Sequence, residues 1–259
     1  MSFYLYDDKK TIIHALDPRT KIFILFVSFI LTLFFDHPIY ILFTGSFILF
    51  YGLLSRALGN IKKVWFLIFV ITVFTTISWS IFGRGQTQLW KGISYESFLY
   101  GLGASLKIDL MIVAGIIFLS TCKNEDVTLG LIKLGLPYAV SFSFGMALRL
   151  APMFLETSST IVEAQKSRGV NFDIKPFWKR FKSYFALLGP VLLTSIRHAN
   201  GLAMALESKG FTYNQKRSFY INLKFKNKDF LIIIVLLIFF LINIYFLYKG
   251  RGKIEGLIL

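Results

Sequence analysis

Apolar residues lie in long runs along this chain and are not spread in the amphipathic patterns of soluble helices and strands. The runs cover residues 22–35, 39–54, 64–82, 98–121 and 230–247. A helix of roughly 20 residues crosses the hydrocarbon core of a membrane, which is about 30 Å thick. Each run therefore predicts one membrane-spanning helix, and Asp36-His37-Pro38 predicts the tight turn between the first two. We predict an all-α integral membrane protein with about five transmembrane helices.

The first run is short for a membrane crossing. Two basic residues, Arg19 and Lys21, lie immediately before it. Long basic side chains at a helix end can reach the polar interface while their carbon chains stay in lipid. We therefore expect Arg19 and Lys21 to lengthen this span on the inner side of the membrane.

Lys107 and Asp109 lie within the fourth run. Two positions apart on a helix, they face different sides and are poor partners for each other. Lys107 lies about 13 Å from the outer end of this helix, deep enough to need a partner elsewhere. We interpret the two residues either as an intramembrane polar contact, with another protein or another helix, or as buried structural groups.

Two further segments, 139–155 and 185–206, are apolar enough to resemble spans. Helix-disfavouring or charged residues interrupt both of them: Arg149 and Pro152 in the first, and Gly189, Pro190, Arg197, His198 and Asn200 in the second. Charges near a helix centre are costly in lipid. We therefore predict long helices that lie under or partly in the inner leaflet, apolar on one face and basic on the other. A seven-span arrangement is the alternative.

Charge predicts the orientation of the chain. The sequence carries 29 Lys and Arg against 14 Asp and Glu, a net charge of +15, and 16 of the basic residues lie in 122–228. Because cytoplasmic loops are rich in Lys and Arg, we place 122–228 in the cytoplasm of a multi-pass cell-membrane protein. Counting spans back from this region places the N-terminus inside as well, and the basic tail after 247 outside.

This orientation gives three predicted domains. Residues 1–121 hold the N-terminal segment and the first four spans, 122–228 form a cytoplasmic domain with long amphipathic helices, and 229–259 hold the last span and the tail. Cys122, the single cysteine, then lies at the cytoplasmic end of the fourth span. We expect its thiol to be reachable only from inside the cell.

Composition excludes several other classes of protein. Hydrophobic residues make up 55% of the chain and charged residues only 17%, whereas soluble domains keep roughly a quarter of their residues charged. One cysteine permits no internal disulfide, and the three histidines, His14, His37 and His198, are too scattered to predict a metal site or a cofactor. The sequence contains no Gly-x-x-x-x-Gly-Lys-Ser/Thr loop, so we predict no nucleotide hydrolysis. The basic region lacks the basic-aromatic clustering of a nucleic-acid module, so we predict no nucleic-acid partner.

A short pattern occurs twice in the basic region. Residues 164–170 and 205–211 share the order Ala-x-x-Ser-basic-Gly-apolar, 41 positions apart. Glycine commonly ends a helix in a left-handed turn, and the helix dipole favours a cation in the last turn, so each copy alone predicts a helix end. Two such ends, each presenting a fixed cation, suit two equivalent acidic grooves on a dimeric partner.

Motifs along nearly the whole chain resemble the transmembrane T component of energy-coupling factor (ECF) transporters, the family that includes CbiQ. The stretches that carry the resemblance are His14-Ala15-Leu16-Asp17-Pro18-Arg19-Thr20-Lys21, Leu134-Gly135-Leu136-Pro137, Ala147-Leu148-Arg149-Leu150-Ala151-Pro152, Glu156 and Ala164-Gln165-Lys166-Ser167-Arg168-Gly169. Their order and spacing together are specific, although none is decisive alone.

The resemblance implies a scaffold rather than a catalyst. Such a T component couples ATP hydrolysis by two ABC-type ATPase subunits to movement of a small integral-membrane S component, which binds a vitamin or a transition-metal ion. By resemblance, Ser167-Arg168-Gly169 and Ser208-Lys209-Gly210 are the two motifs that dock the ATPases, at the ends of cytoplasmic coupling helices. This chain has Ser before the cation at both sites, and Lys209 where Arg is usual. Lysine cannot make the planar two-pronged contact of arginine, so the second site is expected to be weaker.

Two other transporter classes share some of these features. An ABC-type permease with its own substrate path also couples ATPases through cytoplasmic helices, and co-purification with a separate S protein would distinguish the two. A secondary transporter would need paired charges or broken helices near mid-membrane in related halves of the chain. Only Lys107 and Asp109 approach that arrangement.

Overall fold

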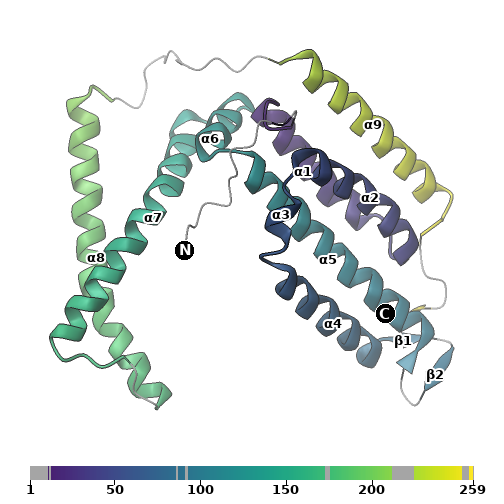
Figure 1. Ribbon diagram of the computed structural model, residues 1–259, viewed down its shortest axis with the longest axis horizontal. Helices are drawn as coiled ribbons and strands as arrows, with labels where there is room; N and C mark the ends of the chain where they lie inside the picture. The colour runs from purple at the N-terminus through teal and green to yellow at the C-terminus, as the bar shows by residue number, and fades with distance from the viewer. Residues whose placement is uncertain are drawn as a thin grey trace. The chain divides into compact units, whose positions relative to one another are not determined.

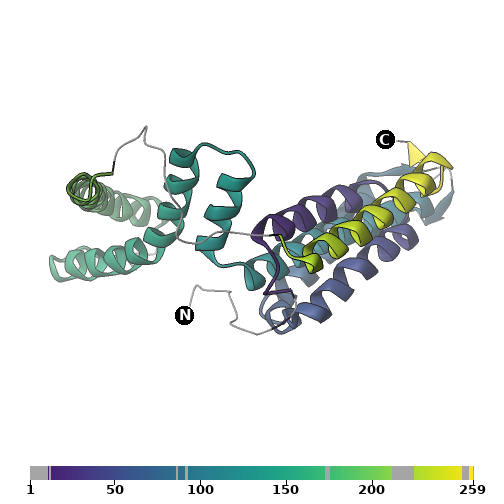
Figure 2. The same ribbon diagram turned by 90° about the horizontal axis from the view of Figure 1, so that it is seen from above.

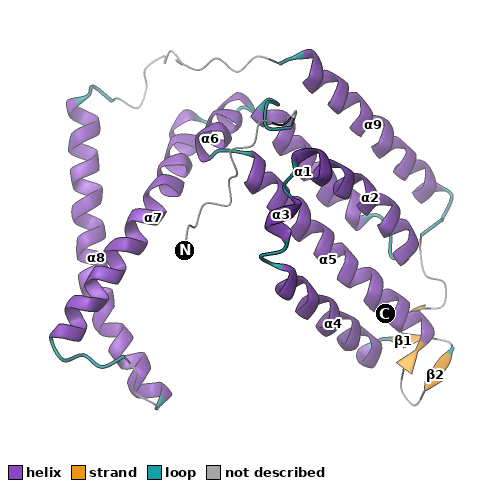
Figure 3. Ribbon diagram, in the orientation of Figure 1, coloured by secondary structure: helices purple, strands orange, loops and turns teal. Residues whose placement is uncertain are grey.

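The computed structural model describes residues 11, 13–85, 87–90, 93–172, 176–211, 225–252 and 257–258. Two compact units divide the chain: Met1–Gly135 with Leu223–Leu259 form the first, and Leu136–Asn222 form the second. The described secondary structure is almost entirely helical (Figure 1, and by type in Figure 3). The predicted all-α fold is confirmed. The predicted cytoplasmic location of residues 122–228 stays a prediction.

Seven helices belong to the described part of the first unit: α1 (Pro18–Leu33), α2 (Pro38–Ser55), α3 (Leu58–Ile61), α4 (Trp65–Phe82), α5 (Tyr95–Thr121), α6 (Asn124–Lys133) and α9 (Asn227–Tyr248). Short antiparallel strands accompany them, β1 (Arg84–Gly85) pairing with β4 (Leu257–Ile258), and β2 (Gln88–Trp90) with β3 (Ile93–Ser94). The second unit contains α7 (Tyr138–Ser167) and α8 (Phe177–Ser208).

Five described helices are long and apolar enough to cross a membrane: α2, α4, α5, α7 and α9. The number agrees with the prediction, but the set differs by one member. The predicted first span corresponds to α1, which has only 16 residues. The fifth candidate is instead α7, a 30-residue helix that we predicted to lie along the inner leaflet.

Helix α5 forms the centre of the first unit, and α1, α2 and α4 run alongside it (Figures 1 and 2). The buried core joins side chains from α2, α5 and the segments on either side of α2: Phe35, Ile41, Ile48, Ala57, Leu110, Val113, Ala114 and Ile117. Leu236 of α9 packs with Ile24, Val27 and Leu31 of α1 in a second cluster. Large apolar side chains on α4 and α9 are exposed, as expected of surfaces that face lipid.

The prediction for Lys21 is wrong. Its side chain is buried, and its Nζ donates hydrogen bonds to the carbonyl oxygens of His14 (3.0 Å) and Thr121 (2.8 Å). Helix α1 begins at Pro18, four residues before the predicted run, so Lys21 lies inside the bundle beside the end of α5. A cation is favourable there because the last carbonyls of a helix carry partial negative charge. The Arg19 side chain also contacts the protein: its guanidinium lies 4.8 Å from the centre of the Phe225 ring.

Cys122 lies at the end of α5, as predicted, but its thiol is not accessible. The residue is only 4% exposed. Burial raises the pKa of the Cys122 thiol to about 12. Reaction with a maleimide requires the thiolate, so burial hinders labelling both by covering the sulfur and by raising its pKa. The expectation that the native thiol can be labelled from inside the cell is therefore wrong.

A relocated cysteine should report the orientation instead. We expect native Cys122 to resist an impermeant maleimide in intact cells and in inverted vesicles alike. Glu125 is exposed on α6, three residues further along the chain. In a Cys122→Ser background, Glu125→Cys should be labelled rapidly in inverted vesicles and not in intact cells. Rapid labelling of Glu125→Cys in intact cells would show that the predicted orientation is reversed.

Candidate functional site at the ends of two long helices

The first predicted motif ends α7. Ser167 is the last helical residue, Arg168 follows with φ −84° and ψ 9°, and Gly169 has φ +84°. The N–H of Gly169 donates to the Lys166 carbonyl at 3.0 Å, and the N–H of Val170 donates to the Gln165 carbonyl at 3.0 Å. These two bonds define a Schellman cap, which requires a residue tolerant of positive φ at the glycine position.

The second motif ends α8 with the same geometry. Lys209 has φ −87° and ψ 9°, and Gly210 has φ +71°. The N–H groups of Gly210 and Phe211 donate to the carbonyls of Glu207 and Leu206, both at 2.9 Å. The repeated sequence pattern therefore folds into the same helix end twice, with Arg168 and Lys209 in equivalent positions and both exposed.

The backbone cap alone does not distinguish these sites. Helix α9 also ends in a lysine followed by a glycine, Lys249 and Gly250, with φ +71° at the glycine. The N–H of Gly250 donates to the Leu247 carbonyl at 2.9 Å, and that of Arg251 to the Phe246 carbonyl at 3.2 Å. Of these three caps, those of α7 and α8 have a serine before the cation. Its hydroxyl donates back into the helix, from Ser167 to the Glu163 carbonyl and from Ser208 to the Ala205 carbonyl.

The two ends differ in local charge. The residue before the serine is Lys166 at the first end and Glu207 at the second, and both side chains are exposed. The last turn of α7 therefore presents two cations, whereas a carboxylate accompanies Lys209 on α8. An acidic partner should bind the α7 end more strongly.

Aromatic contacts hold α7 and α8 together as an antiparallel pair. The rings of Phe154 and His198 stack near the middle of the pair, 6.1 Å apart. Phe211, which follows the second motif, packs 4.9 Å from the ring of Phe142 near the start of α7. Beyond the first motif, Phe172 packs 5.6 Å from the ring of Tyr184 on α8. Figure 1 shows the two helices crossing.

This packing keeps the two motifs far apart. The second motif lies beside Phe142, whereas the first follows the far end of the same helix at Arg168. At about 1.5 Å per residue, that length of α7 separates the two cations by about 40 Å. A single compact groove cannot reach both of them, but two sites on a dimeric partner can.

Helix α8 also carries an exposed apolar stripe. Its members recur every three or four residues and all are exposed: Trp178, Phe181, Phe185, Leu188, Leu192 and Ile196. Arg180 and Arg197 lie off this stripe and are exposed as well. The exposed side chains described on α8 thus divide into an apolar face and a face with basic residues, as predicted.

The structure gives Lys107 and Asp109 separate partners within the first unit. The Nζ of Lys107 lies 2.7 Å from Oδ1 of Asp36, in the turn between α1 and α2. Oδ2 of Asp109 lies 2.7 Å from the hydroxyl of Thr72 on α4. The two residues do not contact a common group, as their spacing predicted. A contact with another protein stays a prediction.

Sequence reasoning missed Asp36 as the partner of Lys107. Asp36 was placed at the outer end of the first span, about 13 Å from the depth expected of Lys107, so depth alone did not pair the two residues. It also missed the contrast between Lys166 and Glu207, which the aligned repeat contains.

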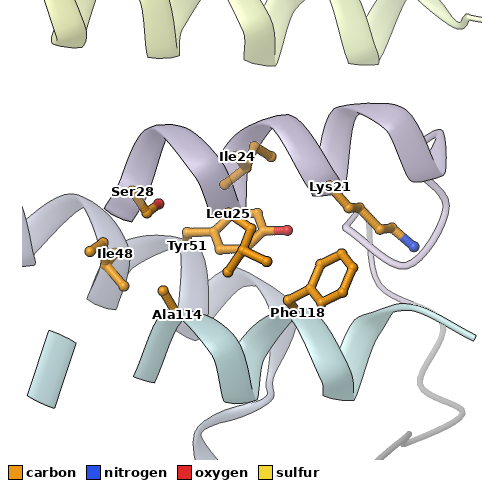
Figure 4. A pocket seen from close by; sticks show the side chains of 8 residues that line it. All are labelled: Lys21, Ile24, Leu25, Ser28, Ile48, Tyr51, Ala114 and Phe118. Atoms are coloured by element: carbon orange, nitrogen blue, oxygen red, sulfur yellow. The ribbon is translucent and has the colours of Figure 1, made fainter. Parts of the chain in front are cut away.

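A small cavity lies among α1, α2 and α5, with a volume of about 10 Å³. Eight residues line it: Lys21, Ile24, Leu25, Ser28, Ile48, Tyr51, Ala114 and Phe118 (Figure 4). The Lys21 head group extends away from the other side chains in this view. The volume suits about one water molecule and is far too small for a vitamin. Within the described residues, no three His, Cys, Asp or Glu side chains are grouped to hold a metal ion.

Known proteins resemble this chain over most of its length. The sequence model of a family described as cobalt transport protein, CbiQ, matches residues 9–221. The "energy-coupling factor transporter transmembrane protein EcfT" of Staphylococcus aureus (strain 04-02981) is 32% identical over 236 residues, covering 84% of this chain and 86% of the relative. The protein of the same name in Lactococcus lactis subsp. cremoris (strain MG1363) is 28% identical over 246 residues, covering 88% and 91%.

Proposed function

The chain belongs to the CbiQ family, and from this premise we propose that it is the scaffold of an energy-coupling factor transporter. In this proposal two ABC-type ATPase subunits bind the ends of α7 and α8, and a small integral-membrane S component carries a vitamin or a transition-metal ion. Hydrolysis of ATP by the partners moves α7 and α8, and that movement reorients the S component. The chain itself has no catalytic role.

The observation that carries this proposal is the pair of matching helix ends. Arg168 and Lys209 occupy the same position in the same backbone cap, are both exposed, and are separated by about 40 Å along α7. Two identical or homologous subunits related by a two-fold axis present two equivalent grooves, which is the arrangement that two equivalent ends require. A cation fixed at a helix end is well placed to make a charge-assisted contact in each groove.

The proposal includes an orientation in the cell membrane. Helices α2, α4, α5 and α9 have the length and composition of spans, and the chain is a multi-pass membrane protein. We infer that residues 122–228 lie in the cytoplasm, because 16 of the 29 basic residues lie there. We also infer that the shorter α1 crosses the membrane together with α2, α4, α5 and α9, which places the N-terminus in the cytoplasm as well. The ATPases would then meet α7 and α8 on the side where ATP is available.

A permease with its own substrate path is the second candidate. The cavity among α1, α2 and α5 holds about 10 Å³, so it is not itself such a path. The partners that co-purify from native membranes discriminate between the two functions.

We expect affinity purification to yield two ATPase subunits and at least one small S protein with this chain. The isolated chain should neither bind nor hydrolyse ATP, because its sequence contains no phosphate-binding loop. Co-elution measured by mass spectrometry, and nucleotide turnover by the isolated chain, are the two measurements. Uptake of substrate by this chain and ATPases without any S protein would instead establish the permease.

A further inference from the structure

The first turn of α1 connects three other helices of the first unit. Five residues form this contact: Asp17, Lys21, Thr121, Gly130 and Asp229, which we call the α1 joint. They come from the start of α1, the end of α5, the middle of α6 and the start of α9. The joint is buried, since Asp17, Lys21, Thr121 and Asp229 are each at most 5% exposed.

A buried carboxylate attaches α9 to this turn. Oδ1 of Asp229 accepts the N–H of Asp17 at 2.8 Å, and Oδ2 accepts the N–H of Lys226 at 2.8 Å. The carboxylate therefore satisfies one backbone donor beside α1 and one at the start of α9. It also lies in the first turn of α9, where the helix dipole favours negative charge.

A buried cation attaches α5, and a close approach attaches α6. Lys21 donates to the last carbonyl of α5, at Thr121. At Gly130 of α6, an added Cβ would lie 3.1 Å from Cδ1 of Ile22 and 3.2 Å from Cβ of Pro18. Helix α6 thus rests on the first turns of α1 at a distance that only glycine permits without adjustment.

The chain enters and leaves the second unit close to these attachments. The first unit ends at Gly135, two residues after α6, and resumes at Leu223, four residues before α9. One covalent connection to α7 and α8 therefore starts from a helix resting on α1. The other returns to a helix bonded to the same turn.

We propose that the α1 joint transmits the movement of α7 and α8 to the membrane-spanning helices, with Asp229 and Gly130 as positioning residues. This inference rests on the proposed function, in which ATP hydrolysis moves α7 and α8. Because α7 follows α6 after only four residues, and α6 rests on this buried turn, a displacement of α7 is passed to α1, and through Lys21 and Asp229 to α5 and α9. If either attachment is loosened, the displacement is absorbed in the connection, and ATP is hydrolysed without transport.

Two substitutions loosen two attachments of the joint separately, that of α9 and that of α6. Asp229→Asn keeps the shape but replaces one carboxylate oxygen by a donor, so one of the two backbone N–H groups loses its acceptor. Gly130→Ala adds a methyl group against the side chains of Ile22 and Pro18, so either these side chains or α6 must shift by a few tenths of an ångström. Gly115→Ala on α5 is the matched control, because nothing lies within 4 Å of the added atom.

The measurement is substrate uptake per ATP hydrolysed, in vesicles containing the complete complex at equal abundance. We expect Asp229→Asn and Gly130→Ala to recruit the ATPases and hydrolyse ATP as the native chain does, with uptake per ATP lowered roughly threefold or more. Gly115→Ala should match the native ratio. A purely structural role would lower recruitment, hydrolysis and uptake in proportion and leave this ratio unchanged.

If uptake per ATP hydrolysed is unchanged in both variants, the α1 joint does not transmit the movement and the proposal is wrong. If Asp229→Asn does not accumulate in the membrane, Gly130→Ala decides alone, because alanine is a better helix former than glycine and leaves every hydrogen bond of the joint in place. Failure of the native chain to recruit ATPases would refute the proposed function itself, and this outcome is visible before any variant is compared.

Discussion

Replacing Arg168 and Lys209 together by alanine will leave the chain in the membrane but will abolish recruitment of the ATPase subunits. A charge-assisted contact contributes about 1.5 to 3 kcal/mol, so losing one should weaken assembly by roughly ten- to a hundredfold. Because both ends bind one dimeric partner, the second contact forms at high effective concentration, and the two losses compound. Pull-down of the ATPases alongside substrate uptake, at equal membrane abundance, measures the effect.

This substitution tests the cations and leaves the helix ends intact. Arg168 and Lys209 have φ values of −84° and −87°, which alanine adopts without strain. Lys249→Ala is the matched control, since it removes a cation from the same backbone cap at the end of α9. Full recruitment by a well-inserted double variant would show that the two motifs only end their helices. An equal loss in the Lys249→Ala control would show that the effect is not specific to α7 and α8.

The same assay ranks the two ends. Arg168→Ala should weaken recruitment more than Lys209→Ala, because arginine loses a two-pronged contact and because Lys166 already makes the first end more positive. Arg168→Glu should be worse still, since it places an anion where the helix dipole is negative. Lys209→Arg should be tolerated or should tighten binding. A larger loss from Lys209→Ala than from Arg168→Ala would contradict the order.

The spans were predictable because each is a long apolar run bounded by charges or by proline. Helices α2, α4, α5 and α9 begin and end within a few residues of the predicted runs. The start of α1 was missed, although its signal is local. Asp17 accepts the N–H of Arg19 as an N-cap at 3.0 Å, and Pro18 occupies the first helical position, so the helix begins before its apolar run does.

The sequence pattern could not predict which residues contact segments far away in the chain. Lys21 was expected at the interface because a basic residue before an apolar run usually lies there. Its burial depends on the end of α5, 100 residues away, coming within hydrogen-bond distance. The burial of Cys122 next to that end has the same origin. Neither contact can be predicted from the local pattern of apolar and polar residues.

The two helix ends that we propose as docking sites were predictable from their residues, whereas their distance from each other was not. The Ser-cation-Gly pattern predicted two helix ends, and glycine at positive φ explains why the two copies fold alike. The distance of about 40 Å between them follows from the antiparallel packing of α7 and α8. That packing depends on aromatic pairs such as Phe142 and Phe211, which are 69 positions apart in the chain.

Replacing Gly103 by alanine will destabilise the first unit. A Cβ at this position would overlap the carbonyl oxygen of Asp36, in the turn between α1 and α2. That atom belongs to the backbone, so no change of rotamer relieves the overlap and the turn must move away from α5. Overpacking of this kind costs about 1 to 3 kcal/mol, which should lower the midpoint of thermal unfolding in detergent by roughly 5 °C.

The movement should also break contacts one helical turn away. Lys107 follows Gly103 by four residues on α5, and its Nζ lies 2.7 Å from Oδ1 of Asp36. The N–H groups of Asp36 and His37 both donate to the carbonyl of Gly252, at 2.8 and 2.9 Å, so the tail after α9 is attached to the same turn. Displacing the turn strains both attachments, and the loss of stability should exceed that of Asp36→Asn, which keeps the backbone in place. Gly115→Ala adds the same methyl group to open space on the same helix, and it should leave the midpoint unchanged or raise it slightly. A midpoint for Gly103→Ala equal to that of Gly115→Ala would show that α5 does not approach the turn as closely as this structure places it.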